Sequence, residues 1–273
     1  MIDEFTFFDE VETMLALLDA EALPETYEYF SRLAAQDEEF FSDFYRVATD
    51  LMLCDKDKTF PAFVVGFITD LYLAEIEKGN ADAMNDLGAH YYGGSHGFQQ
   101  DFEKAFRLYQ MAAENGSRHA QENLGYCYYY GRVGLPDYEK AFHYFALGAF
   151  DGAPVSLYKI GDMYKNGYYV AKNEKEAFQL YLRCLDLMDD KSQREVAGPV
   201  YLRLGKMLLS GSGCNRDVEQ SLVCFQRAEL FLYDMVKAGD YMYKASLQAA
   251  IDGQQKARAE LSTDLPEKTW DFD

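Results

Sequence analysis

The chain has 273 residues, of which 49% are apolar, and a formal net charge of −20 at pH 7. This apolar content is enough for a large buried core. The acidic balance disfavours binding to nucleic acid phosphates or to anionic membranes, because both need clustered Lys and Arg. The five cysteines form no CxxC pair, so we expect reduced, buried thiols in a cytoplasmic protein.

The first 58 residues are strongly acidic and lie outside any clear repeat. Residues 1–50 contain 14 Asp or Glu against two Arg, which is typical of a solvated surface and would also suit the docking of a basic partner. Helix starts at Thr6, Pro24 and Asp37 predict a helical N-terminal cap over residues 1–58. The acidic N-terminus lacks the positive charge of a secretion signal, which favours a cytoplasmic location.

The most apolar window of the chain covers residues 60–76. Asp70 interrupts this window, which is also shorter than the stretch of about 18 residues that a membrane span needs. We therefore predict a buried helix between Pro61 and Gly79. Its Tyr72, seven residues before the closing glycine, matches the second helix of the repeat that follows.

Three similar six-residue stretches recur at a constant interval. DFEKAF occupies residues 101–106, DYEKAF residues 137–142 and NEKEAF residues 173–178, so the period is 36 residues. A period of this length with two helical patterns per unit is typical of a helix-turn-helix repeat array.

The first helix of each unit, helix A, carries a glycine preceded by Leu or Ile. These glycines are Gly88, Gly125, Gly161 and Gly205. Apolar residues at helical spacing around them predict one buried stripe. The tyrosines three residues after the first three glycines share this stripe, so we expect Tyr128 in the core.

The second helix, helix B, begins at a side chain suited to an N-cap. The predicted caps are Asp101, Asp137, Asn173 and Asp217. Four residues further on stands a small residue, and after four more an aromatic one, as in Ala141 and Phe145. The small residue lets the two helices approach, and the aromatic ring fills the space beyond it.

These positions resemble the Sel-one-like repeat family, a branch of the tetratricopeptide type. Its units combine an alanine, the pair LG, a tyrosine, a glycine-bearing loop, D..KA, an aromatic residue and a closing AA..G. The first two units match closely, whereas Met188 replaces a closing glycine and Ser221 an alanine. Eight additional residues separate Gly161 from Gly205, which predicts a longer helix B or a longer loop in the third unit.

The predicted fold is an all-α, right-handed superhelical solenoid of antiparallel helix pairs with an N-terminal helical cap. The array covers residues 59–252 and opens with a degenerate half-unit. Its further units lie near residues 80–116, 117–152, 153–196 and 197–237, followed by a capping helix over 238–252. The tail, residues 253–273, contains Trp270, the only Trp, and could dock on a partner, fold back or fray.

The resemblance also implies which residues bind a partner. In such arrays helix A lines the concave side, and the positions three before and one, four and five after its glycine face the groove. The candidates carried over in this way are Asn85, Tyr92, Glu122, Tyr126, Tyr129, Tyr130, Tyr158, Asp162, Lys165, Asn166 and Lys206. Aromatic residues with a few charges are favoured at protein interfaces. Alternatively, the tyrosines pack between neighbouring units.

We therefore expect a non-enzymatic scaffold or adaptor that holds a protein or peptide, with a basic partner as one option and without cofactor or metal. One alternative is an acidic inhibitor or mimic that docks a basic protein through residues 1–50. Another is an enzymatic or small-ligand role near His119, which forms an HxxE pair with Glu122; two ligands alone do not make a metal site. His90 and His96 flank a loop and are assigned no role.

Overall fold

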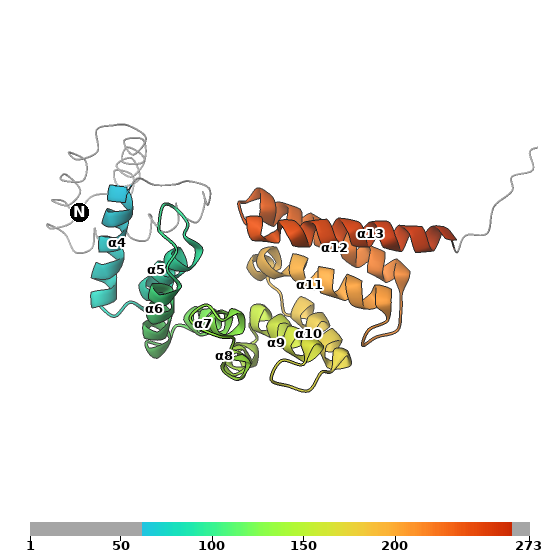
Figure 1. Ribbon diagram of the computed structural model, residues 1–273, viewed down its shortest axis with the longest axis horizontal. Helices are drawn as coiled ribbons and strands as arrows, with labels where there is room; N and C mark the ends of the chain where they lie inside the picture. The colour runs from blue at the N-terminus through green and yellow to red at the C-terminus, as the bar shows by residue number, and fades with distance from the viewer. Residues whose placement is uncertain (1–61, 264–273) are drawn as a thin grey trace, which may run out of the picture. The chain divides into compact units, whose positions relative to one another are not determined.

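The computed structural model describes residues 62–263, and every regular element in this range is helical (Figure 1). The α-helices are α4 (Ala62–Glu77), α5 (Ala81–Gly93), α6 (Phe102–Glu114), α7 (Arg118–Tyr130), α8 (Tyr138–Phe150), α9 (Pro154–Asn166), α10 (Glu174–Asp186), α11 (Asp190–Ser210), α12 (Val218–Lys237) and α13 (Lys244–Thr263). A short 3-10 helix, η1 (Tyr241–Tyr243), precedes α13. The predicted all-α fold of helix pairs is confirmed. The predicted helix starts at Thr6, Pro24 and Asp37, and Trp270, lie outside the described residues.

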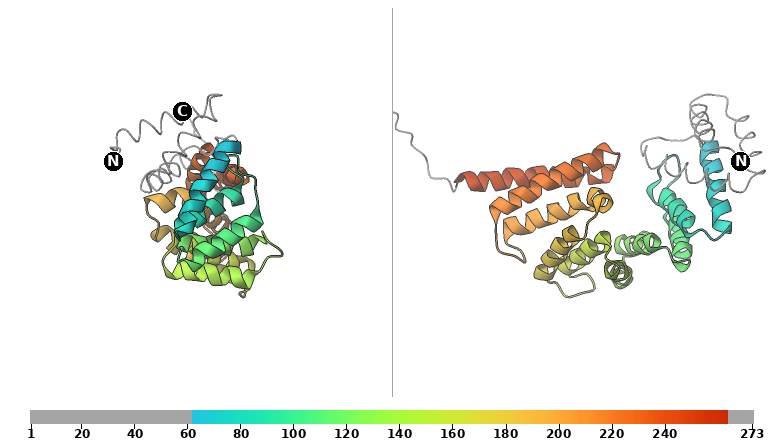
Figure 2. Two further views of the ribbon diagram at one scale, coloured as in Figure 1. Left: turned by 90° about the vertical axis from the view of Figure 1, so that its left-hand side faces the viewer. Right: turned by 180° about the vertical axis from the view of Figure 1, so that it is seen from behind.

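The chain divides into two compact units, at Ser117 and Arg118. We call the described parts the N-terminal unit (residues 62–117) and the C-terminal unit (residues 118–263). In the N-terminal unit α4 packs on α5, and α5 on α6. In the C-terminal unit each helix packs on the next, and the A helices α9, α11 and α13 also contact one another in that order (Figure 1, Figure 2). These three helices therefore form one layer.

The predicted N-caps of the B helices are confirmed. In each case the side-chain oxygen of the cap accepts a hydrogen bond from the backbone N–H three residues later. The donors and lengths are Lys104 to Asp101 at 2.9 Å, Lys140 to Asp137 at 3.0 Å, Glu176 to Asn173 at 3.1 Å and Gln220 to Asp217 at 2.9 Å. The recurring six-residue stretch is thus the capped start of helix B.

The recurrent glycine of helix A lies where an aromatic ring of helix B crosses it. A Cβ atom added to Gly125 would stand 2.7 Å from Phe145, and one added to Gly161 would stand 2.7 Å from Tyr181. Gly88 and Gly205 meet Tyr109 and Phe225 in the same way, at 2.8 and 2.9 Å. Since real Cβ contacts are longer than this, only glycine fits without a shift of the ring. The predicted close crossing is confirmed.

The additional residues of the third unit do not lengthen helix B or its loop, so that prediction was wrong. Helix α10 has 13 residues, as α6 and α8 do, whereas α11 has 21. Pro199 stands one residue after the position at which an ordinary A helix would begin, the position that Pro154 occupies in α9. The chain continues helically before Pro199 because Val196 and Ala197 are buried there and Gly198 allows close contact with Leu232 of the longer α12. This burial offsets the hydrogen bond that the proline removes.

The capping helix extends further along the chain than the residues predicted for it. Helix α13 begins at Lys244 and continues to Thr263, past residue 252. Ala250 and Ala257 are both buried, so the buried stripe continues into the segment assigned to the tail. Gly253 repeats the glycine pattern, because a Cβ atom there would stand 2.5 Å from the Phe225 ring.

The apolar segment before the first full unit is helical, as α4. Its Tyr72 is buried against Ala83 and Leu87 of α5, and Gly79 follows with a φ of +83°. These features are those predicted for a B helix. Within residues 62–263, no helix combines the length and the apolar composition that would let it cross a bilayer.

Candidate partner-binding surface

Helix α7 distributes its tyrosines between the interior and the surface. Leu124 and Cys127 are fully buried, whereas Tyr126, Tyr128 and Tyr129 are half-buried. Tyr130, at the end of the helix, is 46% exposed. Tyr128 is therefore less buried than the sequence predicted: it stacks on Tyr144 of α8, with ring centroids 5.8 Å apart, at the margin of the core.

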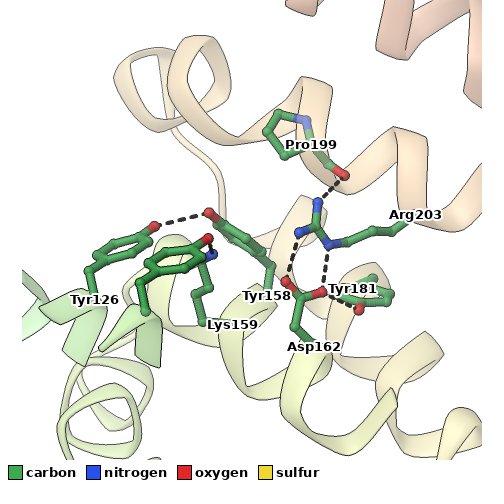
Figure 3. Close-up of polar contacts among 8 residues, drawn as sticks. Tyr126, Tyr158, Lys159, Asp162, Tyr181, Pro199 and Arg203 are labelled. Carbon is green, nitrogen blue, oxygen red and sulfur yellow. Dashed lines mark hydrogen bonds and ion pairs between the residues drawn. The ribbon is translucent and has the colours of Figure 1, made fainter. Parts of the chain in front are cut away.

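The most unusual group of the C-terminal unit is the ammonium of Lys159 on α9 (Figure 3). Lys159 is only 3% exposed and donates a hydrogen bond of 2.8 Å to the hydroxyl of Tyr130. Its Nζ also lies over four tyrosine rings, which we call the tyrosine cage. The distances to the ring centroids are 4.8 Å for Tyr126, 5.1 Å for Tyr129, 4.9 Å for Tyr130 and 5.1 Å for Tyr158. The negative faces of these rings attract the buried charge.

Burial shifts the pKa values of the residues in the cage. It lowers the pKa of Lys159 to about 8, although the nearby carboxylate of Asp162 partly opposes this effect. The hydroxyls of Tyr126 and Tyr158 are hydrogen-bonded at 2.9 Å. Burial raises the pKa of both hydroxyls, and the nearby Tyr243 of η1 raises it further. At neutral pH the cage therefore consists of neutral tyrosines around a cation.

A buried ion pair joins α9 to α11 beside the cage. The guanidinium of Arg203 donates from Nε and Nη2 to the two carboxylate oxygens of Asp162, at 2.5 and 2.7 Å, and from Nη1 to the Pro199 carbonyl at 2.9 Å. Tyr181 of α10 donates to Asp162 at 2.6 Å. Burial alone would raise the pKa of Asp162, but the charge and hydrogen bonds of Arg203 outweigh it and hold the pKa below its usual value. The arrangement fixes three helices relative to one another.

The two residues of the HxxE pair of α7 lie in different surroundings. His119 is exposed, and the Glu122 carboxylate accepts a hydrogen bond of 2.8 Å from Ser156 of α9. In the part of the chain that the structure describes, no three His, Cys, Asp or Glu side chains are grouped as metal ligands. Glu122 therefore connects the second and third repeats of the array, through α7 and α9.

The histidines of the N-terminal unit form part of a buried cluster. His90 Nε2 is hydrogen-bonded to the hydroxyl of Tyr72 at 3.1 Å, and its ring stacks on Phe98 at 4.7 Å. Burial, aided by the charge of His96, lowers the pKa of His90 to about 4, so His90 is neutral at pH 7. His96 lies in the left-handed region, with φ of 56°, and is buried. The turn at His96 is therefore constrained by both its backbone conformation and its burial.

The eleven predicted partner-binding residues differ widely in exposure. Exposed side chains are Tyr130, Asn166 and Lys206; half-buried ones are Asn85, Tyr92, Glu122, Tyr126, Tyr129 and Lys165; buried ones are Tyr158 and Asp162. The two buried residues support the surface from within. Asn85 and Tyr92 belong to the N-terminal unit, where Asn85 donates to Asp86 and Tyr92 packs on Phe102. Direct contact of these residues with a partner stays a prediction.

Two residues that organise the candidate surface, Lys159 and Arg203, were not among the residues predicted from the sequence. Both stand two residues before the recurrent glycine of an A helix, a position that the groove pattern does not include. A charged residue amid the apolar stripe of α9, between Leu157 and Ile160, was the available signal. Such a residue is rarely buried unless it is paired.

Comparisons with known proteins agree with this geometry. The Sel1 repeat family matches residues 81–117, 118–149, 154–183 and 199–229. Among solved structures, a Sel1 repeat protein from Oxalobacter formigenes is 22% identical, with a TM-score of 0.53, over 75% of this chain and 78% of that chain. The protective antigen c5321 of uropathogenic Escherichia coli, which displays an SLR fold, is 19% identical, with a TM-score of 0.50, over 89% of this chain and 61% of that chain. No curated protein matches the chain. With four matched repeats and this fold, the chain belongs to the Sel1 repeat family.

Proposed function

We propose that this protein is a non-enzymatic scaffold that binds a segment of a partner protein on the A helices of its C-terminal unit. Sel1 repeat proteins generally act in protein interactions. The observation that carries the proposal is the tyrosine cage, in which aromatic rings of α7 and α9 are fixed around Lys159 and Tyr130 stays 46% exposed.

A fixed aromatic surface suits binding for an energetic reason. An exposed tyrosine ordinarily loses side-chain freedom when a partner covers it, and this loss reduces affinity. The hydrogen bond from Lys159 already holds the hydroxyl of Tyr130. The ring of Tyr126 is stacked parallel to the ring of Tyr130, with the two ring centroids 6.2 Å apart. Preorganised tyrosines of this kind are frequent among the residues that dominate interface energies.

Some of the tyrosines also pack against other residues of the array, as in the alternative interpretation of the sequence. Tyr129 contacts Tyr138, Phe145 and Tyr168 edge to face, so its removal would disturb the fold as well as the surface. Tyr130 is the member whose loss tests binding.

The experiment uses a partner isolated with the full-length protein from native cells and then purified. Tyr130→Ala should raise the Kd by more than tenfold, on the order of 2 kcal/mol, as loss of an interface anchor does. The matched control is Tyr169→Ala, which removes a tyrosine that is also exposed, at 57%, but lies in the loop after α9. Equal Kd values for the wild type and Tyr130→Ala, in calorimetric titrations, would exclude the cage as the binding site.

The second candidate is docking of a basic protein by the acidic N-terminal segment. Residues 1–50 contain 14 Asp or Glu against two Arg, and this excess favours it. Binding of that kind is lost at about 0.5 M salt, because the Debye length then falls to a few ångströms, whereas binding through the tyrosine cage persists.

As part of the same proposal we place the protein in the cytoplasm; the four described cysteines, which are free thiols, support this location.

A further inference from the structure

The charge of the chain is divided very unevenly. Residues 118–263 contain 18 Lys or Arg and 18 Asp or Glu, so this segment is neutral although the whole chain carries −20. The C-terminal unit is therefore the part of an acidic protein in which a basic surface can form.

Three lysines place positive charge on the A-helix layer of this unit. Lys165 of α9, Lys206 of α11 and Lys256 of α13 stand four, one and three residues after the glycines on which the B-helix aromatics pack. Helix α11 contacts both α9 and α13. Lys206 and Lys256 are exposed and Lys165 is half-buried. We call these three residues the basic patch.

The other two lysines of the basic patch act electrostatically on Lys206. Burial lowers the pKa of Lys206, and the charges of Lys165, Arg203 and Lys256 lower it further. Lys165 and Lys256 are therefore close enough to Lys206 to disfavour its charge, and an added anion would relieve this effect.

The carboxylates that act on Lys165, and the two that stand four residues before and after Lys256, already have partners. Asp162 accepts hydrogen bonds from Nε and Nη2 of Arg203, and Glu174 forms an ion pair with Lys172 at 2.8 Å. On α13, Asp252 accepts a hydrogen bond from Gln248 at 2.9 Å and Glu260 pairs with Arg216. Between residues 62 and 263, no carboxylate forms an ion pair with Lys165, Lys206 or Lys256. Cations gathered without carboxylate partners favour an anionic ligand.

We propose that the basic patch receives carboxylates of an acidic linear peptide in a partner protein, while the neighbouring tyrosine cage contacts the aromatic side chains of that peptide. This proposal rests on the proposed function and specifies the partner as acidic, although the net charge of the chain alone favours a basic one. The patch and the cage belong to adjoining helices: Tyr158, Lys159 and Lys165 share α9, and Arg203, which lies over the Tyr158 ring at 5.1 Å, shares α11 with Lys206.

The test uses full-length protein and two fluorescein-labelled peptides, EFEDYEEFDE and its amide counterpart QFQNYQQFNQ, in fluorescence anisotropy titrations. The acidic peptide should bind with a Kd at least tenfold lower than the neutral one. Lys206→Glu with Lys256→Glu should weaken binding of the acidic peptide at least tenfold, and the milder Lys206→Gln with Lys256→Gln at least threefold. Circular dichroism melting of each variant checks that it is folded.

The matched control reverses two other exposed lysines, on the B helices. Lys175→Glu with Lys237→Glu makes the same change in net charge on α10 and α12 and should leave the Kd within about twofold, since exposed charges that do not contact the ligand are screened by water and salt. The inference fails if the neutral peptide binds as tightly as the acidic one. It also fails if the control weakens binding as much as the patch variant, because the effect is then one of net charge.

A further arm tests whether the chain's own acidic residues fill the patch. Residues 264–273 contain four Asp or Glu, and a full-length variant with Asp264→Asn, Glu267→Gln, Asp271→Asn and Asp273→Asn replaces all four with amides. If the acidic peptide binds this variant and not the wild type, the occupant is the chain itself and the partner proposal is overturned. If neither peptide binds but Tyr130→Ala still weakens binding of the isolated partner, the proposed function stands and only the acidic class of ligand is rejected.

Discussion

Asp162 on α9 and Arg203 on α11 form a two-pronged ion pair, with N–O distances of 2.5 and 2.7 Å, that connects consecutive A helices. Both groups are largely removed from water: the Asp162 side chain is 9% exposed and that of Arg203 is 25% exposed. Such a pair stabilises little relative to an apolar contact of the same shape, but it is costly to break on one side only, because one buried charge is then left without a partner.

Arg203→Met should therefore lower the free energy of unfolding by about 3 to 5 kcal/mol. Arg203→Met combined with Asp162→Leu should recover a large part of this loss, since no buried charge is left. Urea denaturation at pH 7 measures both variants. If the double variant is no more stable than the single one, the loss comes from packing or from the Pro199 contact and not from the unpaired carboxylate.

The stability of the protein should depend on pH through Lys159. Its pKa is lowered from 10.5 to about 8 in the folded protein, so between these values the unfolded chain binds more protons and stability rises with pH. Relative to Lys159→Met, which cannot titrate, the wild type should gain about 2 kcal/mol between pH 7.5 and 9.5. Urea denaturation of the two proteins across this range gives the difference directly.

The pH range of this experiment has an upper limit. Burial raises the pKa of Tyr126, Tyr129 and Tyr158, so above about pH 10 the unfolded chain releases protons that the folded protein retains, and stability falls again. A stability difference that is flat from pH 7.5 to 9.5 would mean that the ammonium is solvated and not enclosed by the cage.

The repeat unit could be predicted from the sequence because its determinants are local. An N-cap at Asp137, a small residue at Ala141 and a ring at Phe145 follow one another within a single helix, and the glycine that faces the ring recurs at the same register. Such features depend on spacing along one or two adjoining helices, and the structure confirms them.

The surroundings of Lys159 and the length of α11 could not be predicted, for a different physical reason. The cage combines residues of α7 with residues of α9, about 30 positions apart, and depends on the angle at which the two helices meet. Likewise, residues before Pro199 become helical because Gly198 and Leu232 pack together. In both cases tertiary contacts between distant segments outweigh local propensity.

The glycine of helix A can be tested by adding a single carbon. Gly125→Ala would place its Cβ atom 2.7 Å from the Phe145 ring, which is fully buried. We expect a loss of about 1 to 3 kcal/mol in the free energy of unfolding. The control is Gly66→Ala on α4, where no atom of residues 62–263 lies within 4 Å of the added atom; there the better helix propensity of Ala should give a gain of about 0.5 to 1 kcal/mol.

Tyr128→Ala measures how far the margin of the core contributes to stability. The sequence predicted a core residue, for which truncation costs about 3 to 5 kcal/mol. In the structure the Tyr128 ring is half-buried between the ring of Tyr144 and the ammonium of Lys140, which lies 5.0 Å from its centroid. Because water already reaches part of the ring, its removal leaves a smaller cavity, and we expect a cost of about 1 to 2 kcal/mol. Phe145→Ala, which removes a fully buried ring, should cost about 3 to 5 kcal/mol under the same conditions. Equal losses for the two variants, measured by urea denaturation, would show that Tyr128 belongs to the core after all and that α7 is rotated about its axis so as to turn this ring inward.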